Sequence, residues 1–531
     1  MTTADRPPDL TGAASVVLRA SLVMTAAAVV SRVLGWVRLL VIGAEFGASS
    51  ELDAYLAAFR IPDAIFQLVV AGALSAALIP VYAGYRARGE TDEGWELASN
   101  VINLVVLALA GLSAIMAIGA PWLVPIIAPG FDPETTALTV RLTQIMLISP
   151  VFIGLGAVVS GLLQTHGTFG PTSVAPLVYN LAIIGAAVLV APVMGVEALA
   201  AGVVVGAVGH LVIQIPALRR LDPAWRPRID LRHRGVRRVS VLMGPRVFGL
   251  AAGQVNLIVS TALASGLAAG SITAFTYAFQ LSQLPVGIIG VSIAVALFPT
   301  LSRDAALGRA SAIRRQVNAS LRVLFFVTAP LAALMIVLHG PVASVFFEYG
   351  LFSAESADRT ASALAWFAVG VPAHVVVHVL TRAFYAMQDT RTPVTWAVVA
   401  VVANIGLMLL LVGRMGVEGL ALAISLSATL EVVGLLAALR IRLGGLDGRL
   451  LLASFTRSGV ATLVASLAML GAFLGTIATF PSLEGTGVGR LVTLLVPAGV
   501  GGAAYLVAGL ALRAPELTTL RRIAARRSAG P

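Results

Sequence analysis

Long apolar segments recur along the whole 531-residue chain and constrain its fold more than any other feature. A helix that crosses a bilayer needs about 20 apolar residues, and 58% of this chain is hydrophobic whereas only 11% is charged. Soluble globular proteins have roughly 25% charged residues, so this composition excludes a soluble multidomain enzyme and a disordered chain. The segments also lack the two-residue alternation of outer-membrane barrels. The sequence therefore predicts an all-α polytopic membrane protein.

The apolar pattern predicts about fourteen transmembrane helices and no cleavable signal peptide, because the first apolar run is too long for one. Several segments are long enough to require tilt, a kink or an extension beyond the bilayer. The expected ranges are 14–43, 54–84, 98–128, 138–163, 171–193, 196–218, 238–265, 271–301, 318–346, 360–387, 393–413, 416–439, 455–477 and 488–512.

The basic residues, which are all arginines, predict the orientation of the chain in the membrane. Loops after odd-numbered segments hold acids: Glu45, Glu51, Asp132, Glu134, Glu348, Glu355 and Glu484. Loops after even-numbered segments, and the C-terminal tail, hold arginines: Arg219, Arg220, Arg226, Arg228, Arg232, Arg234, Arg237, Arg238, Arg303, Arg309, Arg314, Arg315, Arg440, Arg442, Arg449, Arg513, Arg521, Arg522, Arg526 and Arg527. Arginine-rich loops stay in the cytoplasm, so we expect both termini there. Since this bias explains the net charge of +11, we expect no nucleic-acid partner.

An internal repeat divides the chain. Residues 194–200 (Met-Gly-Val-Glu-Ala-Leu-Ala) return as residues 415–421 (Met-Gly-Val-Glu-Gly-Leu-Ala), 221 positions later. Each repeat contains six segments in the same orientation, which is typical of transporters whose two halves rock against each other. We therefore expect two pseudo-symmetric six-helix lobes, 14–218 and 238–439, and an additional helix pair at 455–512.

Charged residues inside the predicted spans mark a candidate binding cavity, since such residues are costly in a membrane. Arg32 and Arg38 lie about 9 Å apart along one helix and roughly 120° apart around it. Arg60 and Arg246 add further guanidinium groups, and Asp53 lies at the outer end of the second segment. Arginine binds phosphate bidentately and keeps its charge when desolvated. These residues predict a cavity for a multiply charged anion.

Other interpretations of the polar residues remain open. The arginines can instead extend to the membrane surface or pair with Asp53 and Asp63 to brace helices. The triplet from Glu51 to Asp53 is compatible with the metal site of a membrane glycosyltransferase. His374 and His378 are spaced as a metal pair, but no third ligand is apparent and no cysteine or Walker motif is present. We expect no metal, no cofactor and no enzymatic reaction.

Several motifs resemble those of the MurJ/MviN family, the lipid II flippases of the MOP exporter superfamily. They are the stretches 31–38, 46–48, 53–55, 59–62, 72–80 and 382–393. The resemblance implies transport of an undecaprenyl-pyrophosphate-linked peptidoglycan precursor from the inner to the outer leaflet of the bacterial cytoplasmic membrane. It also implies that Arg32, Arg38 and Arg60 hold the pyrophosphate, that Asp53 orients or gates it, and that segments 13 and 14 hold the polyprenyl tail in lipid.

The sequence departs from the family pattern at positions where the family carries charges. These positions are Phe66, Gln67 and Ala71 in segment 2 and Phe279, Gln280 and Gln283 in segment 8. Loss of a balanced set of charges can leave a working cavity, with Gln280 and Gln283 bonding a sugar or peptide. Alternatively, the cargo is another polyprenyl-linked glycan or amphiphile, or the chain is a non-transporting scaffold that binds partners through its arginine loops. Coupling to the membrane potential or to ions is also left open.

Overall fold

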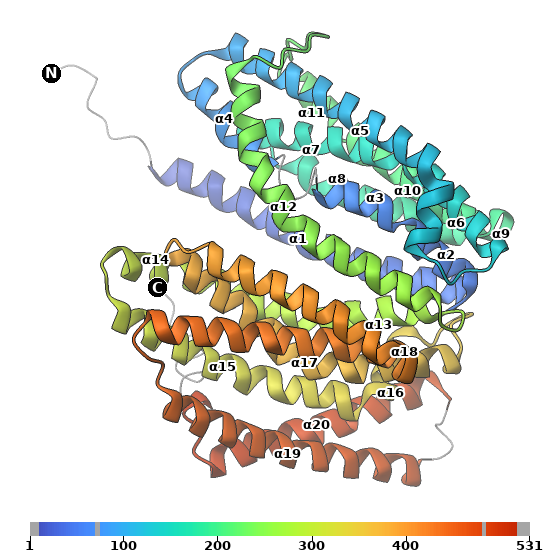
Figure 1. Cartoon of the computed structure of the whole chain (residues 1–531), viewed down its shortest axis with the longest axis vertical. Helices are drawn as coiled ribbons and strands as arrows, with labels where there is room; N and C mark the ends of the chain where they lie inside the picture. Colours follow the sequence, from blue (N-terminus) through green and yellow to red (C-terminus); the bar gives the residue numbers. More distant parts are fainter. Residues whose placement is uncertain (1–9, 69–74, 481–484, 518–531) are drawn as a thin grey trace. The chain divides into compact units, whose positions relative to one another are not determined.

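The computed structural model describes residues 10–68, 75–480 and 485–517, and within these the side chains of 10–23, 75, 76, 242 and 244–252 lie outside the description. The chain divides into two compact units, Met1–Ala262 and Leu263–Pro531. The described residues form helices and connecting turns, with no strand among them. The predicted all-helical membrane fold is thus confirmed (Figure 1).

The helices of each unit follow one another through short connections. Unit 1 contains α1 (Leu10–Phe46), α2 (Ser50–Ala58), α3 (Arg60–Ile65), α4 (Ser75–Ala87), α5 (Thr91–Ile127), α6 (Pro133–Met146), α7 (Ser149–Thr165), α8 (Gly170–Gly185), η2 (Ala186–Val190), α9 (Ala191–Met194), α10 (Glu197–Val212), α11 (Ile215–Arg219) and most of α12 (Arg234–Ser265). Unit 2 contains α13 (Ser271–Pro285), η3 (Val286–Gly290), α14 (Val291–Ala306), α15 (Ala310–Val337), α16 (His339–Phe347), α17 (Ala354–Ala386), α18 (Arg391–Arg442), α19 (Gly448–Thr479) and α20 (Gly487–Ala511).

Each predicted transmembrane segment overlaps one or more of these helices. Within the described residues, 11 helical stretches are long and apolar enough to cross a membrane. One of them, α18, holds two predicted segments, because its 52 residues are divided by a non-helical glycine, Gly416. The two further predicted segments correspond to the stretch from α2 to α4 and to α12.

The two copies of the sequence repeat share an unusual backbone conformation. Gly195 has φ 63° and ψ −148°, and Gly416, its counterpart 221 residues later, has φ 58° and ψ −133°. This region of φ/ψ space is essentially limited to glycine, because a Cβ atom would clash with the backbone. The glycine at the second position of the repeated motif therefore breaks the chain between the last two spans of each six-segment repeat in the same way.

Contacts inside each unit show which loops lie together. In unit 1, the rings of Tyr82 and Trp95 both approach His166, which brings the ends of α4 and α7 beside the start of α5. In unit 2, Asn318 donates to Asp447 at 2.9 Å, so the start of α15 lies beside the turn after α18. The loops after even-numbered segments thus gather at one end of each unit, as alternating spans require.

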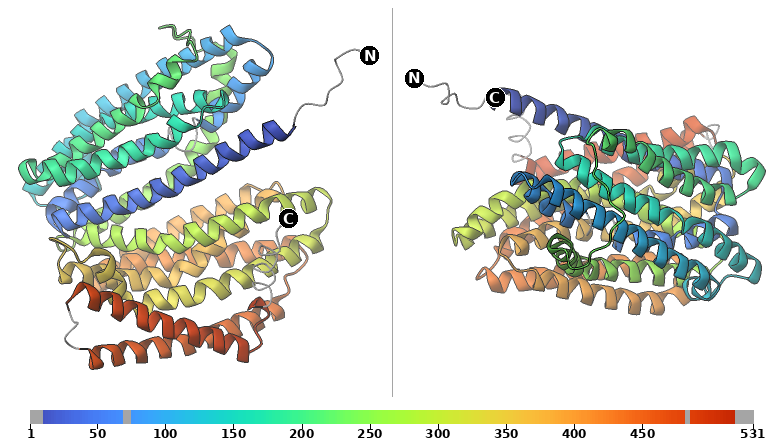
Figure 2. Two further views of the ribbon diagram at one scale, coloured as in Figure 1. Left: turned by 180° about the vertical axis from the view of Figure 1, so that it is seen from behind. Right: turned by 90° about the horizontal axis from the view of Figure 1, so that it is seen from above.

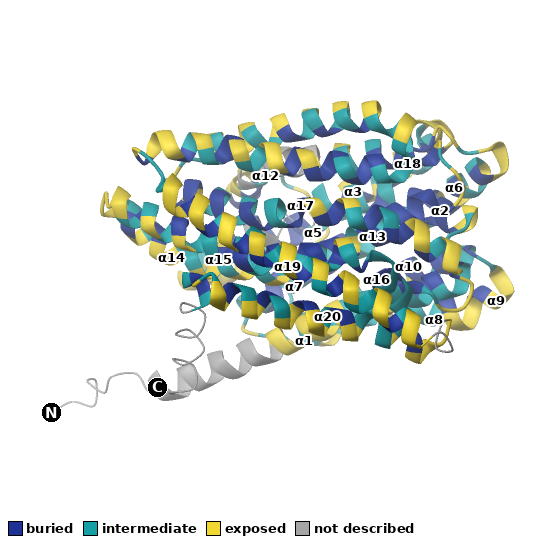
Figure 3. Cartoon of the chain, turned by 90° about the horizontal axis from the view of Figure 1, so that it is seen from below, coloured by how far each residue is buried: buried dark blue, intermediate teal, exposed yellow. Residues whose placement is uncertain are grey.

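Exposed residues recur along the outer faces of the helices (Figure 3). Many are large and apolar, including Leu467 and Leu495, which are 63% and 62% exposed. Apolar side chains on the outside of a helical bundle are the expected surface toward lipid tails. The helices α19 and α20 lie side by side as a pair (Figure 2).

One buried acid joins this helix pair to the rest of unit 2. Glu516 is 1% exposed, and its Oε1 accepts hydrogen bonds from Arg322 on α15 and Ser454 on α19, both at 2.7 Å. On α20, the hydroxyl of Tyr505 donates to the carbonyl of Phe326 at 2.6 Å.

We expect Glu516→Gln to lower the free energy of unfolding by about 2 kcal/mol, since it leaves Arg322 without its charged partner. Thermal unfolding of the detergent-solubilised protein measures this loss of stability. The control is Glu355→Gln, because Glu355 forms an exposed ion pair with Arg359, and such pairs contribute about 0–1 kcal/mol. Equal losses in the two variants would contradict the anchoring role of Glu516.

The turn between α17 and α18 predicts a pH dependence of stability. Asp389 accepts hydrogen bonds from the backbone N–H of Thr392 at 3.0 Å and from its hydroxyl at 2.8 Å, and it pairs with Arg442. Burial raises the pKa of Asp389, but the bonds from Thr392 and the charge of Arg442 outweigh it, so the pKa is lowered. A lowered pKa in the folded state means that this stabilisation exists above pH ~4 and is lost as the pH falls further.

We therefore expect Asp389→Asn to destabilise the protein by about 1–2 kcal/mol at neutral pH. The difference from the unsubstituted protein should narrow below about pH 4, as measured by thermal unfolding across a pH series. Asp358→Asn, at an exposed position on α17, is the matched control and should leave stability unchanged. A pH-independent difference for Asp389→Asn would refute the electrostatic explanation.

Candidate functional site

Unit 1 encloses a cavity of about 450 Å³ with both polar and apolar walls. It lies among α1, the junction of α2 and α3, and the helices α7, α8 and α10. The lining residues are Arg38, Phe59, Pro62, Asp63, Phe66, Ser149, Pro150, Ile153, Ala157, Ser160, Thr172, Pro176, Tyr179 and His210. Pockets that combine apolar walls with a few converging polar groups are typical of binding sites for small or amphiphilic ligands.

A break in the second span forms one wall of the cavity. Helix α2 is capped by Ser49, whose hydroxyl accepts from the N–H of Leu52 at 3.2 Å. A single turn residue, Phe59, separates α2 from α3, and Pro62 lies in the first turn of α3. Proline is tolerated there because the first N–H groups of a helix have no partner within it. Both Phe59 and Pro62 line the cavity.

Arg38 provides the positive charge of this cavity. Its half-buried side chain makes no hydrogen bond with any residue that the structure describes. The carboxylate of Asp63 interacts electrostatically with both Arg38 and Arg60. The five donors of a guanidinium group suit phosphate oxygens. Arg38 is thus positioned to bind an anion in a site that also contains a counter-charge.

His210 also lines the cavity and has an unsatisfied ring nitrogen. The Nδ1 atom of His210 is buried and has no hydrogen-bond partner within the described residues. Below it, Ser160 donates to the Oε1 of Gln214 at 2.7 Å, and the Nε2 of Gln214 donates to the His210 carbonyl at 2.9 Å. A buried polar atom without a partner is costly.

Two glycines allow the cavity walls to approach each other. A Cβ atom at Gly156 on α7 would lie 2.6 Å from the Nδ1 of His210, so only glycine leaves room for the imidazole ring there. A Cβ atom at Gly206 on α10 would lie 2.9 Å from the carbonyl oxygen of Tyr179. Small residues at such positions let membrane helices pack closely.

The residues predicted from the sequence occupy different surroundings. Arg38 lines the cavity, whereas Arg32 is exposed on α1. Asp53 is 3% exposed near the start of α2. The Nε of Arg60 donates to the hydroxyl of Thr261 on α12 at 2.8 Å, so this guanidinium group braces two helices.

Three predicted residues lie elsewhere. Arg246 lies on α12, and its side chain is outside the part of the chain that the structure describes. Gln280 and Gln283 lie on α13 in unit 2, the former exposed and the latter half-buried. The structure therefore places Arg38 in one cavity with Ser160, Tyr179 and His210. The sequence did not indicate these three as binding residues.

The alternative metal sites find little support in the geometry. Glu51 is exposed whereas Asp53 is buried, so the two carboxylates face different surroundings on α2. His374 and His378 lie on α17 of unit 2, and within the described residues no group of three His, Asp or Glu side chains is placed to hold a metal ion.

The uncharged replacements in segment 2 lie at or near the cavity. Phe66 is part of the lining, and the Nε2 of Gln67 donates to Asp63 at 3.5 Å. Ala71 lies outside the described residues. Where the family resemblance leads one to expect basic side chains, the cavity thus has an aromatic wall from Phe66, and Gln67 bonds to the lining residue Asp63.

Two solved structures share the fold of this chain. One is described as lipid II flippase MurJ in an inward closed conformation, with a TM-score of 0.75 and 23% identity, covering 93% of this chain and 99% of that one. Another is an inward-facing multidrug resistance MATE family transporter of the MOP superfamily, with a TM-score of 0.66 and 15% identity, covering 77% of this chain and 94% of that one. The fold of this chain is thus that of a class of helical membrane proteins that includes these two.

Sequence comparisons identify the family within that class. The family model described as "Lipid II flippase MurJ" matches residues 42–483. Lipid II flippase MurJ of Burkholderia cenocepacia is 35% identical over 435 residues, 80% of this chain and 84% of the relative. The probable lipid II flippase MurJ of Vibrio cholerae is 30% identical over 502 residues, 92% of this chain and 95% of the relative. The chain belongs to the lipid II flippase MurJ family, as its motifs predict.

Proposed function

We propose that this protein is a lipid II flippase. It moves the undecaprenyl-pyrophosphate-linked peptidoglycan precursor from the inner to the outer leaflet of the bacterial cytoplasmic membrane for cell-wall synthesis. The observation that carries this proposal is the family match over residues 42–483, and the Arg38 cavity supplies a site for an anionic head group. The reaction is transport, without covalent chemistry, and needs no cofactor.

In this proposal Arg38 binds the pyrophosphate of the cargo. Its unbonded guanidinium group supports that role, because charge-assisted hydrogen bonds to phosphate strengthen in a water-poor cavity. Arg32, Arg60 and Arg246 supply further positive charge for the pyrophosphate, and Asp53 orients or gates the head group. The contact between Arg60 and Thr261 then holds α3 against α12 in one state of the cycle.

The remaining elements take the other parts of the lipid. Gln280 and Gln283 bond the sugar or peptide, and the α19–α20 pair keeps the polyprenyl tail in the bilayer. The lobes 14–218 and 238–439 rock to expose the cavity alternately, and the termini and arginine-rich loops lie in the cytoplasm. The positive-inside distribution of arginine supports this orientation.

A second candidate cargo is another polyprenyl-linked glycan. The observation in its favour is Phe66, which gives the cavity an apolar aromatic wall at a position where the family resemblance leads one to expect a charge. Aromatic faces pack well against the apolar face of a sugar ring, so a head group with fewer charges than lipid II also suits this cavity.

A depletion and rescue experiment tests the proposal. The resident lipid II flippase is removed from a bacterial host, this chain is expressed, and lipid II on the outer leaflet is counted. We expect rescue of growth and of surface lipid II. Failure to rescue, with the protein detected in the membrane, would contradict lipid II as the cargo and favour the second candidate.

A further inference from the structure

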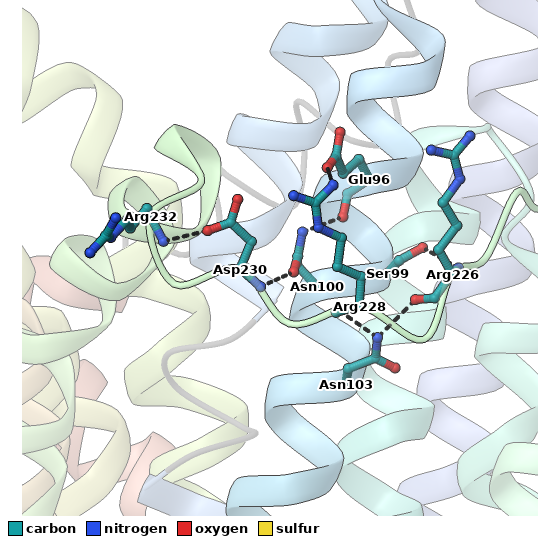
Figure 4. A network of polar contacts seen from close by, with 8 residues as sticks. All are labelled: Glu96, Ser99, Asn100, Asn103, Arg226, Arg228, Asp230 and Arg232. Carbon is teal, nitrogen blue, oxygen red and sulfur yellow. Dashed lines mark hydrogen bonds and ion pairs between the residues drawn. The ribbon is translucent and has the colours of Figure 1, made fainter.

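The irregular segment 220–233, between α11 and α12, is held along the first part of α5 (Figure 4). We call this segment the basic strap. The side-chain amide of Asn103 donates to the carbonyls of Arg226 at 2.9 Å and Arg228 at 2.8 Å. The hydroxyl of Ser99 accepts from the N–H of Arg226 at 3.2 Å. The strap backbone is therefore fixed although it forms no helix.

Further contacts hold both ends of this stretch. The Oδ1 of Asn100 accepts from the N–H of Asp230 at 2.6 Å, and the indole N–H of Trp225 donates to the Oδ1 of Asn103 at 3.2 Å. The carboxylate of Asp230 accepts from the N–H of Arg232 at 2.8 Å. These contacts use the strap's backbone, the indole of Trp225 and the carboxylate of Asp230, and none of them involves a guanidinium group.

The strap and its flanks carry concentrated positive charge. Arg228 has an exposed ion pair with Glu96 at 3.4 Å. The other arginines are exposed and form no ion pair with any acid in the part of the chain that the structure describes; they are Arg219, Arg220, Arg226, Arg232, Arg234, Arg237 and Arg238. Such a cluster attracts anions, and arginine in particular binds phosphate.

Large apolar side chains stand between these arginines. Trp225, Ile229 and Leu231 are 53%, 49% and 70% exposed. A segment in contact with water alone gains nothing from exposing them, whereas a segment at a lipid surface buries them among head groups and upper acyl chains. Tryptophan and arginine are both typical of that interfacial layer.

The length of α5 places the strap at the level of that layer. Helix α5 has 37 residues and is thus about 55 Å long, whereas the hydrocarbon core is about 30 Å thick. Asn103 lies about 18 Å from the start of α5. The acids in its first turn, Asp92 and Glu93, favour a start of α5 outside the hydrocarbon core, which puts the anchoring residues near the boundary of the core. The ring of His233, the last residue of the strap, lies near the ring of Tyr85 at the end of α4. The end of the strap is therefore at the level of a helix end.

We propose that the basic strap is a binding surface for anionic phospholipid head groups. The arginines bind the lipid phosphates, and Trp225, Ile229 and Leu231 insert beside them. This interaction is separate from cargo transport, since it involves bulk lipids at the end of unit 1 and not the Arg38 cavity. The apolar residues and their depth favour a lipid surface over a nucleic acid or an acidic soluble protein.

A lipid-counting experiment on the full-length protein tests the proposal. The protein in neutral detergent is titrated with phosphatidylglycerol or phosphatidylcholine, and bound lipids are counted by native mass spectrometry. One variant carries R226Q, R232Q, R234Q and R237Q. The control carries R303Q, R315Q, R440Q and R449Q, which removes four exposed arginines from unit 2. We expect the strap variant to bind phosphatidylglycerol at least about tenfold more weakly and the control to bind nearly normally. Equal losses would overturn the proposal.

A second variant separates the ordered surface from net charge. Asn103→Ala keeps every arginine but removes the bonds to Trp225, Arg226 and Arg228. We expect faster hydrogen exchange across residues 225–230 and an approximately threefold weaker affinity for phosphatidylglycerol. A loosened strap with unchanged lipid affinity would overturn the role of the fixed backbone.

The last experiment tests whether the strap binds a nucleic acid or an acidic protein instead of lipid. A labelled RNA duplex and polyglutamate are added to the protein in phosphatidylcholine nanodiscs. We expect no binding that depends on the strap arginines. If the strap variant loses affinity for either polymer and keeps its affinity for phosphatidylglycerol, the lipid proposal is wrong.

Discussion

Replacement of Arg38 by alanine is expected to lower outward movement of lipid II by at least about tenfold, with the protein still folded and inserted. A hydrogen bond to a charged group contributes about 1.5–3 kcal/mol, and each 1.4 kcal/mol changes an equilibrium tenfold. Arg38 is the arginine that lines the unit 1 cavity, and its side chain makes no hydrogen bond within the described residues. The measurement is surface lipid II in the depleted host.

Two further variants make the Arg38 result specific. Arg38→Lys keeps the charge but loses the planar fork, so it should retain partial activity. Arg141→Ala removes an exposed arginine of the same unit that has only a 3.6 Å contact with Glu197, and it should transport normally. Full activity of Arg38→Ala would refute the assignment of the pyrophosphate site to this cavity.

Replacement of Gly156 by alanine is expected to reduce transport about tenfold. The added Cβ would lie 2.6 Å from the Nδ1 and 2.9 Å from the Cε1 of His210, closer than atoms approach in folded proteins. Overpacking of this kind costs about 1–3 kcal/mol. We expect the imidazole ring to relieve the clash by moving into the cavity, and we therefore expect lost transport with a modest loss of thermal stability.

A double substitution tests whether the clash is the cause. Gly156→Ala combined with His210→Ala removes the obstructing ring, so transport should be higher than in Gly156→Ala alone. This non-additivity is the signature of two residues in direct contact. Gly185→Ala, at a helical glycine with no atom within 4 Å of the added Cβ, is the control. Additive effects of the two substitutions would contradict the steric explanation.

The membrane architecture was predictable from the sequence because it depends on local properties. Apolar runs of 20 or more residues have few stable alternatives to transmembrane helices, and arginine distribution follows the sides of the membrane. The repeat at Gly195 and Gly416 was also readable, since only glycine adopts the shared conformation at those positions. The family motifs around Arg38 and Asp389 were readable because each is a short continuous stretch of the sequence.

The composition of the cavity was not predictable in this way. Arg32 and Arg38 look equivalent in the sequence, yet one is exposed and the other lines a cavity with Tyr179 and His210. Arg60 looked like a ligand-binding residue, and its partner Thr261 lies 201 positions away. Separations of this size cannot be read from helical periodicity, which relates only neighbours within a few turns.

The sequence by itself therefore determined that the chain is a helical protein that crosses the membrane many times, and to which family it belongs. Tertiary structure decided which arginine lines the cavity, why position 156 is glycine, and that the basic strap lies fixed along α5. The physical reason is that hydrophobicity and charge act on each segment separately, whereas cavities and hydrogen-bond partners depend on which distant helices pack together.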